Sequence, residues 1–249
     1  MQRVTGSKFK LAQLCQFPWV SNIPWVEGKS WSSVIGTHTH TYAETGRLPA
    51  AREVLDLTDR QVEIIKGGAE QFNLWASARP NEMVGVRKEV ALWYHPDTGE
   101  AGEVVQAGPV RRHRDYSFAP PGAWCATIDM VGGPNTSWDF ADIKTGWAPD
   151  PPDKSEQMLF IGVCISKIRH KPELRAGILS LRERNHAFMP ATLNEFALDA
   201  TRRKVSLVQK AIVAGDGPKP GEHCKVCPIN QACPSSTVKK KKRKNAGND

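Results

Sequence analysis

Two aspartates and a lysine form the most chemically suggestive group in this sequence. Asp142 and Lys144 stand two residues apart in Asp142-Ile143-Lys144, and side chains at that spacing on a strand project from the same face. Asp129 lies in the preceding apolar segment, and the intervening Gly132-Gly133-Pro134-Asn135 predicts a turn. If that turn closes a hairpin, residues whose numbers sum to about 270 lie opposite one another. Asp129 is therefore expected beside Asp142.

Two carboxylates this close repel each other unless a cation lies between them. Their hard oxygen atoms suit Mg²⁺ or Mn²⁺. The ammonium group of Lys144 could stabilise an anionic intermediate or hold a water that the metal has acidified. This combination predicts the hydrolysis of a phosphodiester bond. The alternative is a surface hairpin with Asp142 and Lys144 as a solvated ion pair, but the apolar residues that flank both aspartates favour carboxylates set into a sheet.

Three of the six cysteines form the pattern Cys-x2-Cys-x5-Cys at Cys224, Cys227 and Cys233. In a reducing compartment such crowding indicates metal or cofactor ligation rather than disulfides. Thiolates at this spacing predict zinc or an iron–sulfur cluster, and either one needs a fourth ligand. His223, next to the first cysteine, could complete a zinc site. Two further cysteines, Cys125 and Cys164, fall in apolar segments and are expected in the core.

The helices and strands expected from the sequence position these residues. Together they predict an α/β fold, a small mixed sheet flanked by helices. Helices are expected over 8–16 with Ser7 as its cap, 34–45, 58–78, 154–168 and 192–213. Strands are expected over 84–94, 123–131, 137–144 and near 175–182. Pro18 and Pro24 are expected to break the chain after the first helix.

We expect a single domain over 1–236, followed by a disordered basic tail over 237–249. Within the domain, 1–80 is a helical N-terminal part, 83–190 the core, and 191–236 the last helix with the cysteine cluster. The net charge of +8 is concentrated in that tail, because residues 239–244 carry six positive charges and residues 1–238 balance 28 basic against 25 acidic residues. Bulk charge is therefore weak support for DNA binding by the folded part. The tail is either a solvated end or a nonspecific phosphate-binding arm.

No run of apolar residues approaches the length of a membrane span, about eighteen or more. The N-terminal residues also lack the apolar stretch of a secretory signal. These features predict a cytoplasmic protein that does not enter a membrane.

The spacing of these residues resembles the motifs of RecB-like nucleases in the PD-(D/E)XK superfamily. Asp129 followed by Asp142-x-Lys144-Thr145-Gly146 is similar to the family's Gly-x-x-Asp and Asp-x-Lys-Thr-Gly motifs. Upstream, the segment Gly36-Thr37-His38-Thr39-His40 resembles Gly-Thr-x-x-His, and downstream Gln157 matches the glutamine of Gln-x-x-x-Tyr. The motifs follow the family's order over residues 36–157.

This resemblance implies a restriction-endonuclease-like core with a defined set of site residues. His40, Asp129 and Asp142 would hold Mg²⁺ or Mn²⁺, and Lys144 and Gln157 would join the aspartates as catalytic residues. His38 competes with His40 for the ligand position. Glu89, on the first expected strand, is either an additional ligand or orienting group, or a solvent-facing carboxylate.

The sequence departs from the family pattern at two positions. Ile161 stands where the family has tyrosine, and Ala126 replaces the glycine before Asp129. The loss of the tyrosine affects contacts with the substrate strand more than metal binding.

Within this superfamily, the cysteines resemble those of AddB-like nucleases and the CRISPR-associated Cas-four-type exonucleases. Those enzymes take one cysteine from an N-terminal helix and three from the C-terminus. The resemblance therefore implies that Cys15, Cys224, Cys227 and Cys233 bind a [4Fe-4S] cluster that joins the two ends of the chain. The alternative is a local zinc site that uses His223.

The function that the resemblance implies is a metal-dependent exonuclease acting on single-stranded DNA or DNA ends. Prespacer trimming in CRISPR adaptation, with CRISPR integrase proteins as partners, and DNA recombination or repair are its implied settings. The alternatives are a sequence- or structure-specific endonuclease and a non-catalytic DNA-binding scaffold. The intact Asp129, Asp142 and Lys144 argue against the scaffold.

Overall fold

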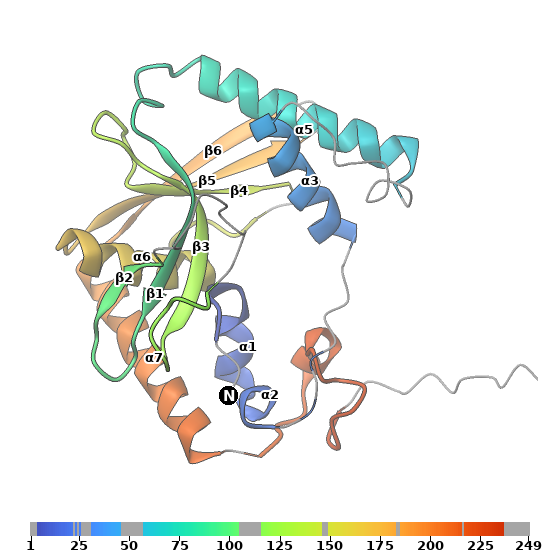
Figure 1. The fold of residues 1–249 in the computed structure, drawn as a ribbon, viewed down its shortest axis with the longest axis vertical. Coiled ribbons are helices and arrows are strands. Elements are labelled where there is room, and N and C mark those ends of the chain that lie inside the picture. The colour runs from blue at the N-terminus through green and yellow to red at the C-terminus, as the bar shows by residue number, and fades with distance from the viewer. Residues whose placement is uncertain are drawn as a thin grey trace, which may run out of the picture.

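A six-stranded mixed sheet forms the centre of the structure (Figure 1). The computed structural model describes residues 4–21, 23, 25, 31–45, 57–104, 116–145, 149–182, 185–215 and 217–236. The strands run in the order β2-β1-β3-β4-β5-β6, in which β4 and β5 are parallel and the other neighbours antiparallel. Their bounds are β1 Arg87–Tyr94, β2 Ala101–Glu103, β3 Trp124–Val131, β4 Phe140–Lys144, β5 Leu174–Arg182 and β6 Asn185–Leu193.

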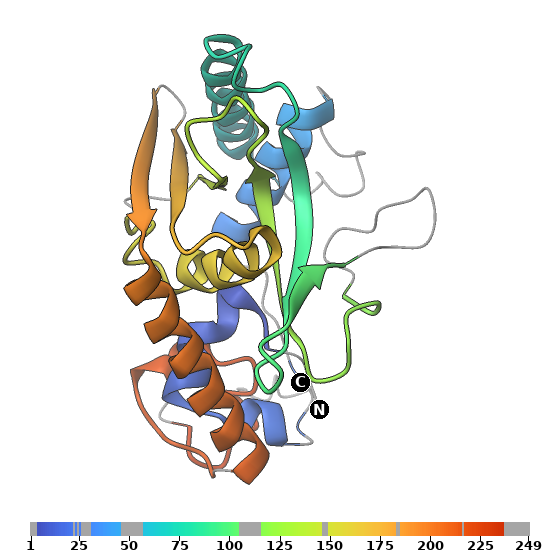
Figure 2. The ribbon, with the colours of Figure 1, turned by 90° about the vertical axis from the view of Figure 1, so that its left-hand side faces the viewer.

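Helices flank this sheet on both sides (Figures 1 and 2). On one side, α6 (Glu156–Arg169) packs against the sheet, and α1 (Phe9–Leu14) and α7 (Glu195–Ala214) pack against α6. On the other side, α5 (Asp59–Ser77) packs against β5 and β6, with α3 (Trp31–Thr45) beside it. The described residues also form three short helices: η1 (Gly6–Lys8), α2 (Phe17–Val20) and η2 (Glu222–Val226). The expected α/β architecture of a mixed sheet flanked by helices is confirmed.

Local side-chain bonds set the ends of the long helices. At the start of α5, Thr58 accepts a hydrogen bond from the amide of Gln61, whose side chain accepts one from the Thr58 amide. Ser155 caps α6 in the same way through the Met158 amide. That helix ends at His170, whose left-handed backbone (φ 52°) turns the chain towards β5.

The main differences from the sequence prediction lie at the two edges of the sheet. The edge strands β2 and β6 were not predicted, and the helix expected from residue 192 begins at Glu195 because residues 192 and 193 end β6. The side chain of Asn194 accepts a hydrogen bond from the Ala197 amide and so fixes that start. None of the helices within the described ranges is long and apolar enough to cross a membrane.

The first expected helix is also divided. Ser7 lies inside η1 and does not cap a helix, and α1 ends at Leu14. Pro18 does not break the chain but lies in the first turn of α2, where its missing amide hydrogen costs no helical bond. Pro24 and the basic tail over 237–249 lie outside the described residues.

The predicted hairpin between β3 and β4 is confirmed, and it opens where the aspartates stand. Met130 pairs with Ala141 and Val131 with Phe140, which gives the register expected from the sequence. Beyond these two pairs β4 continues alongside β5 as far as Lys144. The first half of β3 instead bonds to the N-terminal segment, since the Cys125 amide donates to the Val4 carbonyl (3.0 Å). The two strands therefore diverge around Asp129 and Asp142.

Candidate metal centre

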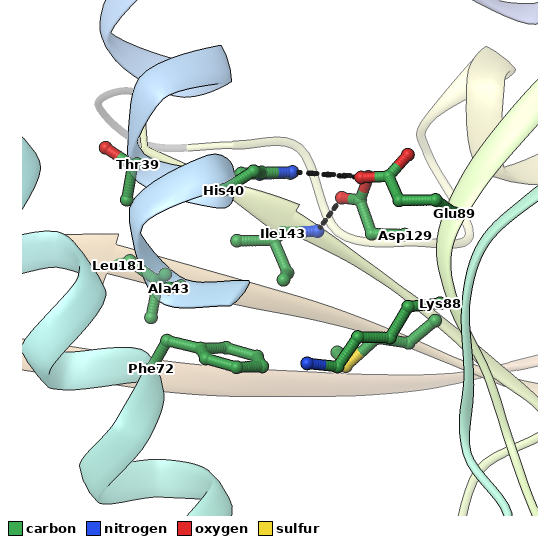
Figure 3. Close-up of a pocket in the computed structure, with 10 residues that line it drawn as sticks. Thr39, His40, Ala43, Phe72, Lys88, Glu89, Asp129, Ile143 and Leu181 are labelled. Carbon is green, nitrogen blue, oxygen red and sulfur yellow. Dashed lines mark hydrogen bonds and ion pairs between the residues drawn. The ribbon is translucent and has the colours of Figure 1, made fainter. Parts of the chain in front are cut away.

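The diverging ends of β3 and β4 hold the two aspartates beside each other. One oxygen of Asp129, Oδ2, accepts a hydrogen bond of 2.6 Å from the amide of Ile143, the residue after Asp142 (Figure 3). The side chain of Asp142 is only 4% exposed, and its Oδ2 lies 2.5 Å from Lys144 Nζ. This contact is an ion pair without hydrogen-bond geometry. The strand spacing thus produces the expected group of Asp129, Asp142 and Lys144.

Lys144 also contacts the helix on the first side of the sheet. Its Nζ donates a hydrogen bond of 3.1 Å to Oε1 of Gln157, in the first turn of α6. The ammonium group is therefore held between a carboxylate and an amide oxygen. Ile161, one turn further along α6, is fully buried in the core. The residue that stands where the resembling nucleases have tyrosine therefore faces the core.

The helix α3 places His40 opposite the two strands because it packs very closely. A Cβ atom at Gly36 would lie 3.2 Å from Thr145 Oγ1, at the end of β4. Similarly, a Cβ atom at Gly68 in α5 would lie 2.9 Å from Thr39 Cγ2. The absence of a side chain at Gly68 therefore lets α3 pack closely against α5. Both contacts fix the position of His40. His38 points elsewhere, because residues two apart on a helix differ in direction by about 200°.

Glu89 completes the centre from an unusual backbone conformation. Its φ is +52°, in the left-handed region, although it lies inside β1. The strand changes faces at this residue, since Val90 packs in the cluster beneath α6 whereas Lys88 Nζ lies 5.2 Å from the Phe72 ring of α5. A non-glycine residue in this region costs of order 1–3 kcal/mol and persists only where its surroundings enforce it. The strain directs the Glu89 carboxylate towards His40.

Three side chains could hold a metal ion together: His40, Glu89 and Asp129, each offering one ligand atom within 4.8 Å of the other two. His40 Nδ1 lies 3.5 Å from Glu89 Oε1 and 3.6 Å from Asp129 Oδ1 (Figure 3). Glu89, which the sequence left open, therefore belongs to this group. Asp142, which was expected as a ligand, is adjacent to it but is paired with Lys144.

The charges of these groups are strongly coupled. Burial alone would lower the pKa of His40, but the hydrogen bond to Glu89 and the charges of Asp129, Glu89 and Asp142 raise it to about 9. Burial and the negative charge of Asp142 raise the pKa of Asp129 to about 8, although His40 opposes them. Without a metal ion, protons therefore compensate the carboxylate charge. A divalent cation could replace them, since protons are released when such a site binds metal.

The four cysteines that the resemblance singled out, Cys15, Cys224, Cys227 and Cys233, line one pocket. The ribbons of the two segments that carry them, the first helices and the segment after α7, lie side by side (Figures 1 and 2). Burial, and then the negative charges of Cys15, Cys224 and Cys233, raise the pKa of the Cys227 thiol. Cys15 Sγ also accepts a hydrogen bond of 3.4 Å from the Lys219 amide, which the sequence did not suggest. Among the described residues no three thiols fall within 4.8 Å of one another.

His223 has a contact of its own, and the other two cysteines, Cys125 and Cys164, lie in other surroundings. His223 lines the pocket, but its Nε2 lies 2.9 Å from the Lys219 carbonyl oxygen. Cys125 and Cys164 are fully buried, as expected, and burial raises the pKa of the Cys164 thiol strongly. These two thiols belong to the core and not to the pocket.

Comparison with known proteins does not assign this chain to a group. No protein-family model matches the sequence, and no curated protein matches it. The chemistry of the candidate metal centre therefore has to be argued from its own geometry and from the motifs that it carries.

Proposed function

We propose that the protein is a metal-dependent DNA nuclease with a PD-(D/E)XK-type core, and specifically an exonuclease. One observation carries this proposal. Asp129 and Asp142 stand where β3 and β4 diverge, with Lys144 paired to Asp142 and His40 facing them from α3. A solvated surface hairpin would leave these groups exposed, whereas the Asp142 side chain is 4% and the Asp129 side chain 13% exposed.

The residues have separate roles in hydrolysis. Asp129, His40 and Glu89 would hold Mg²⁺ or Mn²⁺, with Asp142 as an adjacent carboxylate. The bound ion would act as a Lewis acid and make a bound water more acidic. To serve as a ligand, His40 must give up the proton that its raised pKa retains. The clustering of carboxylates around one histidine favours this exchange of protons for a cation.

Lys144 acts on the anionic groups of the reaction. Its ammonium group contacts Asp142 Oδ2 and Gln157 Oε1, and these two contacts restrict where the group can lie. From there it can stabilise the charge that develops on the phosphate or hold the attacking water. Gln157 is a positioning residue, because it contacts Lys144 and acts through it.

We propose further that the four-cysteine pocket holds a [4Fe-4S] cluster. Tetrahedral zinc, with Zn–S bonds of about 2.3 Å, would bring its thiolates to within about 4 Å of one another. Among the described residues no three thiols lie within 4.8 Å of one another, and His223 is bonded to a backbone carbonyl. A cluster of four irons holds its cysteine sulfurs further apart, so it fits this pocket better. The cluster would tie residues near position 15 to residues 224–233.

The substrate preference and the partners follow the same resemblance. We propose single-stranded DNA or DNA ends as substrate, in CRISPR adaptation beside integrase proteins or in recombination and repair. The test is a comparison of linear and circular single-stranded DNA with Mg²⁺, Mn²⁺ or EDTA. An exonuclease degrades only the linear strand, and only with metal. Cleavage of the circle would indicate the endonuclease instead, and no cleavage of either would reject nuclease activity.

A further inference from the structure

A second cavity, separate from the candidate metal centre, opens at the beginning of β4. Its volume is about 430 Å³, and its basic lining residues are Arg169, Lys171 and Arg175. The rest of the lining consists of Asp139, Gly85 and residues of the loop between β3 and β4. None of His40, Glu89, Asp129, Asp142 or Lys144 lines this cavity.

A single buried carboxylate orders the basic side chains. Asp139 Oδ1 accepts hydrogen bonds from Lys171 Nζ (2.8 Å) and Arg169 Nη1 (3.1 Å), and Oδ2 accepts one from the Arg175 amide (2.9 Å). Arg169 Nη2 also donates to the Gly132 carbonyl oxygen (2.9 Å). Asp139 thus holds the Arg169 and Lys171 side chains in place and fixes the backbone of Arg175. Its one negative charge offsets one of the three positive charges, which leaves an excess of two.

The turn after α6 is what brings these cations together. Because His170 has a left-handed backbone, Arg169 and Lys171 on either side of it both reach Asp139. Lys171 is about half exposed, so its ammonium group retains access to solvent. The guanidinium of Arg175 is exposed, and the described residues include no hydrogen-bond partner for it. Both side chains therefore keep donors for a ligand.

Glycine backbone forms part of the remaining wall, beside Pro134, Thr136 and Trp138. A Cβ atom at Gly132 would lie 2.3 Å from the Trp138 carbonyl oxygen, and one at Gly133 would lie 2.3 Å from the Val84 carbonyl oxygen. A larger residue at either glycine would therefore require the backbone to shift. The cavity thus keeps its volume beside two fixed loops.

We infer that this cavity binds a phosphate ester of about the size of a nucleotide. Arginine and lysine donors with an excess of positive charge match the oxygens of a phosphate, and the guanidinium can bind two of them at once. The volume exceeds that of a bare phosphate and lies in the range of small-molecule sites. The ligand is either a free nucleotide or one phosphate with its nucleoside in a DNA strand.

This site is distinct from the metal centre but near it. Gly132 lies three positions after Asp129, just past the end of β3, and Asp139 lies three positions before Asp142, just ahead of β4. At a rise of about 3.3 Å per residue, the two sites lie roughly 10 Å apart along the strands. The inference does not depend on the proposed nuclease activity, because it rests on a different set of residues.

The test is a binding measurement on the full chain in EDTA, so that no hydrolysis occurs. The probes are inorganic phosphate, adenosine 5′-monophosphate and a short single-stranded oligonucleotide, each titrated by calorimetry. We expect Arg175→Gln to weaken binding about 5- to 10-fold, and Lys171→Gln combined with it to weaken binding further. The matched control is Arg203→Gln, because Arg203 is an exposed arginine of α7 outside the cavity.

Each outcome has a fixed meaning. Monophosphate binding that depends on Arg175 supports a free nucleotide as the ligand, and oligonucleotide binding alone with the same dependence supports a strand phosphate. Binding of inorganic phosphate alone would overturn the nucleotide-sized ligand. No binding of any probe, or equal binding by the Arg175 and Arg203 variants, would overturn the site itself. These titrations contain no divalent metal and report no cleavage, so their outcome is independent of the nuclease assay.

Discussion

Replacing Asp129 by asparagine should stabilise the metal-free protein at neutral and alkaline pH. The change removes one negative charge from a buried group of carboxylates and keeps an oxygen that can accept the bond from the Ile143 amide. The asparagine relieves the repulsion between like charges and the cost of burying a charge. These gains outweigh the loss of the Asp129 carboxylate as a partner of His40, because His40 keeps its contact with Glu89.

The magnitude follows from the pKa of Asp129, which rises from 3.8 to about 8 in the folded chain. The folded protein holds this proton more tightly than the unfolded chain does. The stability that the carboxyl provides is therefore complete below pH 3.8 and is lost as the pH rises to 8. Each pKa unit corresponds to about 1.4 kcal/mol, so the four-unit shift sets an upper limit of about 6 kcal/mol. Because His40 and Asp142 share the charge, we expect about 2–3 kcal/mol at pH 8.

The assay is thermal unfolding in EDTA at pH 4 and pH 8, with Asp97→Asn as the matched control in the exposed turn after β1. About 2–3 kcal/mol corresponds to roughly 5–10 °C in a domain of this size. The Asp129→Asn variant should gain that increment at pH 8 and little at pH 4, and Mn²⁺ should raise the Tm of the parent only. A variant that melts below the parent at pH 8 would refute the reasoning about repulsion.

Three further changes test other parts of the structure. Asp139→Asn should cost about 2–3 kcal/mol at pH 7. Burial would raise the pKa of Asp139, but Lys171, the Arg175 amide and Arg169 hold it below its usual value. The stability it provides is thus present above pH 3.8 and is lost at lower pH, so urea unfolding of parent and variant should converge in acid. Gln157→Leu removes one of the two partners of Lys144. It should lower kcat about 10- to 100-fold with little change in KM, and it should shift the pH profile of the rate. Cys15→Ser should abolish the brown colour and the iron of anaerobically purified protein. It should also lower the Tm, because ligation closes a loop of roughly two hundred residues. One retained equivalent of zinc would favour the local site instead.

The sequence predicted the central hairpin well because its signals are local. Alternating apolar residues, a glycine turn and the register between β3 and β4 together place Asp129 beside Asp142. The edge strand β6 escaped prediction, since it contains Pro190 and alternates between exposed and half-buried residues. Its last residues also read as the start of the following helix, which in fact begins after Asn194.

The rest of the site depends on contacts that sequence spacing does not encode. The left-handed backbone of Glu89 brings its carboxylate to His40, and no residue pattern in β1 signals it. No sequence pattern singles out Asp139, although it orders Arg169 at the end of α6 and Lys171 in the following turn, 30 and 32 residues away. Such long-range polar contacts become visible only when the sheet brings the segments together.

The most direct test of the central claim compares cleavage of a labelled single strand by the parent, Asp142→Asn and Asp97→Asn, with Mn²⁺. Asp142 lies beside the metal triad and pairs with Lys144, whereas Asp97 lies in an exposed turn. We expect the Asp142 variant to lose at least about 1,000-fold in rate while it remains folded, and the Asp97 variant to cut as the parent does. Degradation by Asp142→Asn at the parent rate, or by the parent in EDTA, would contradict the assignment of this centre to metal-dependent hydrolysis.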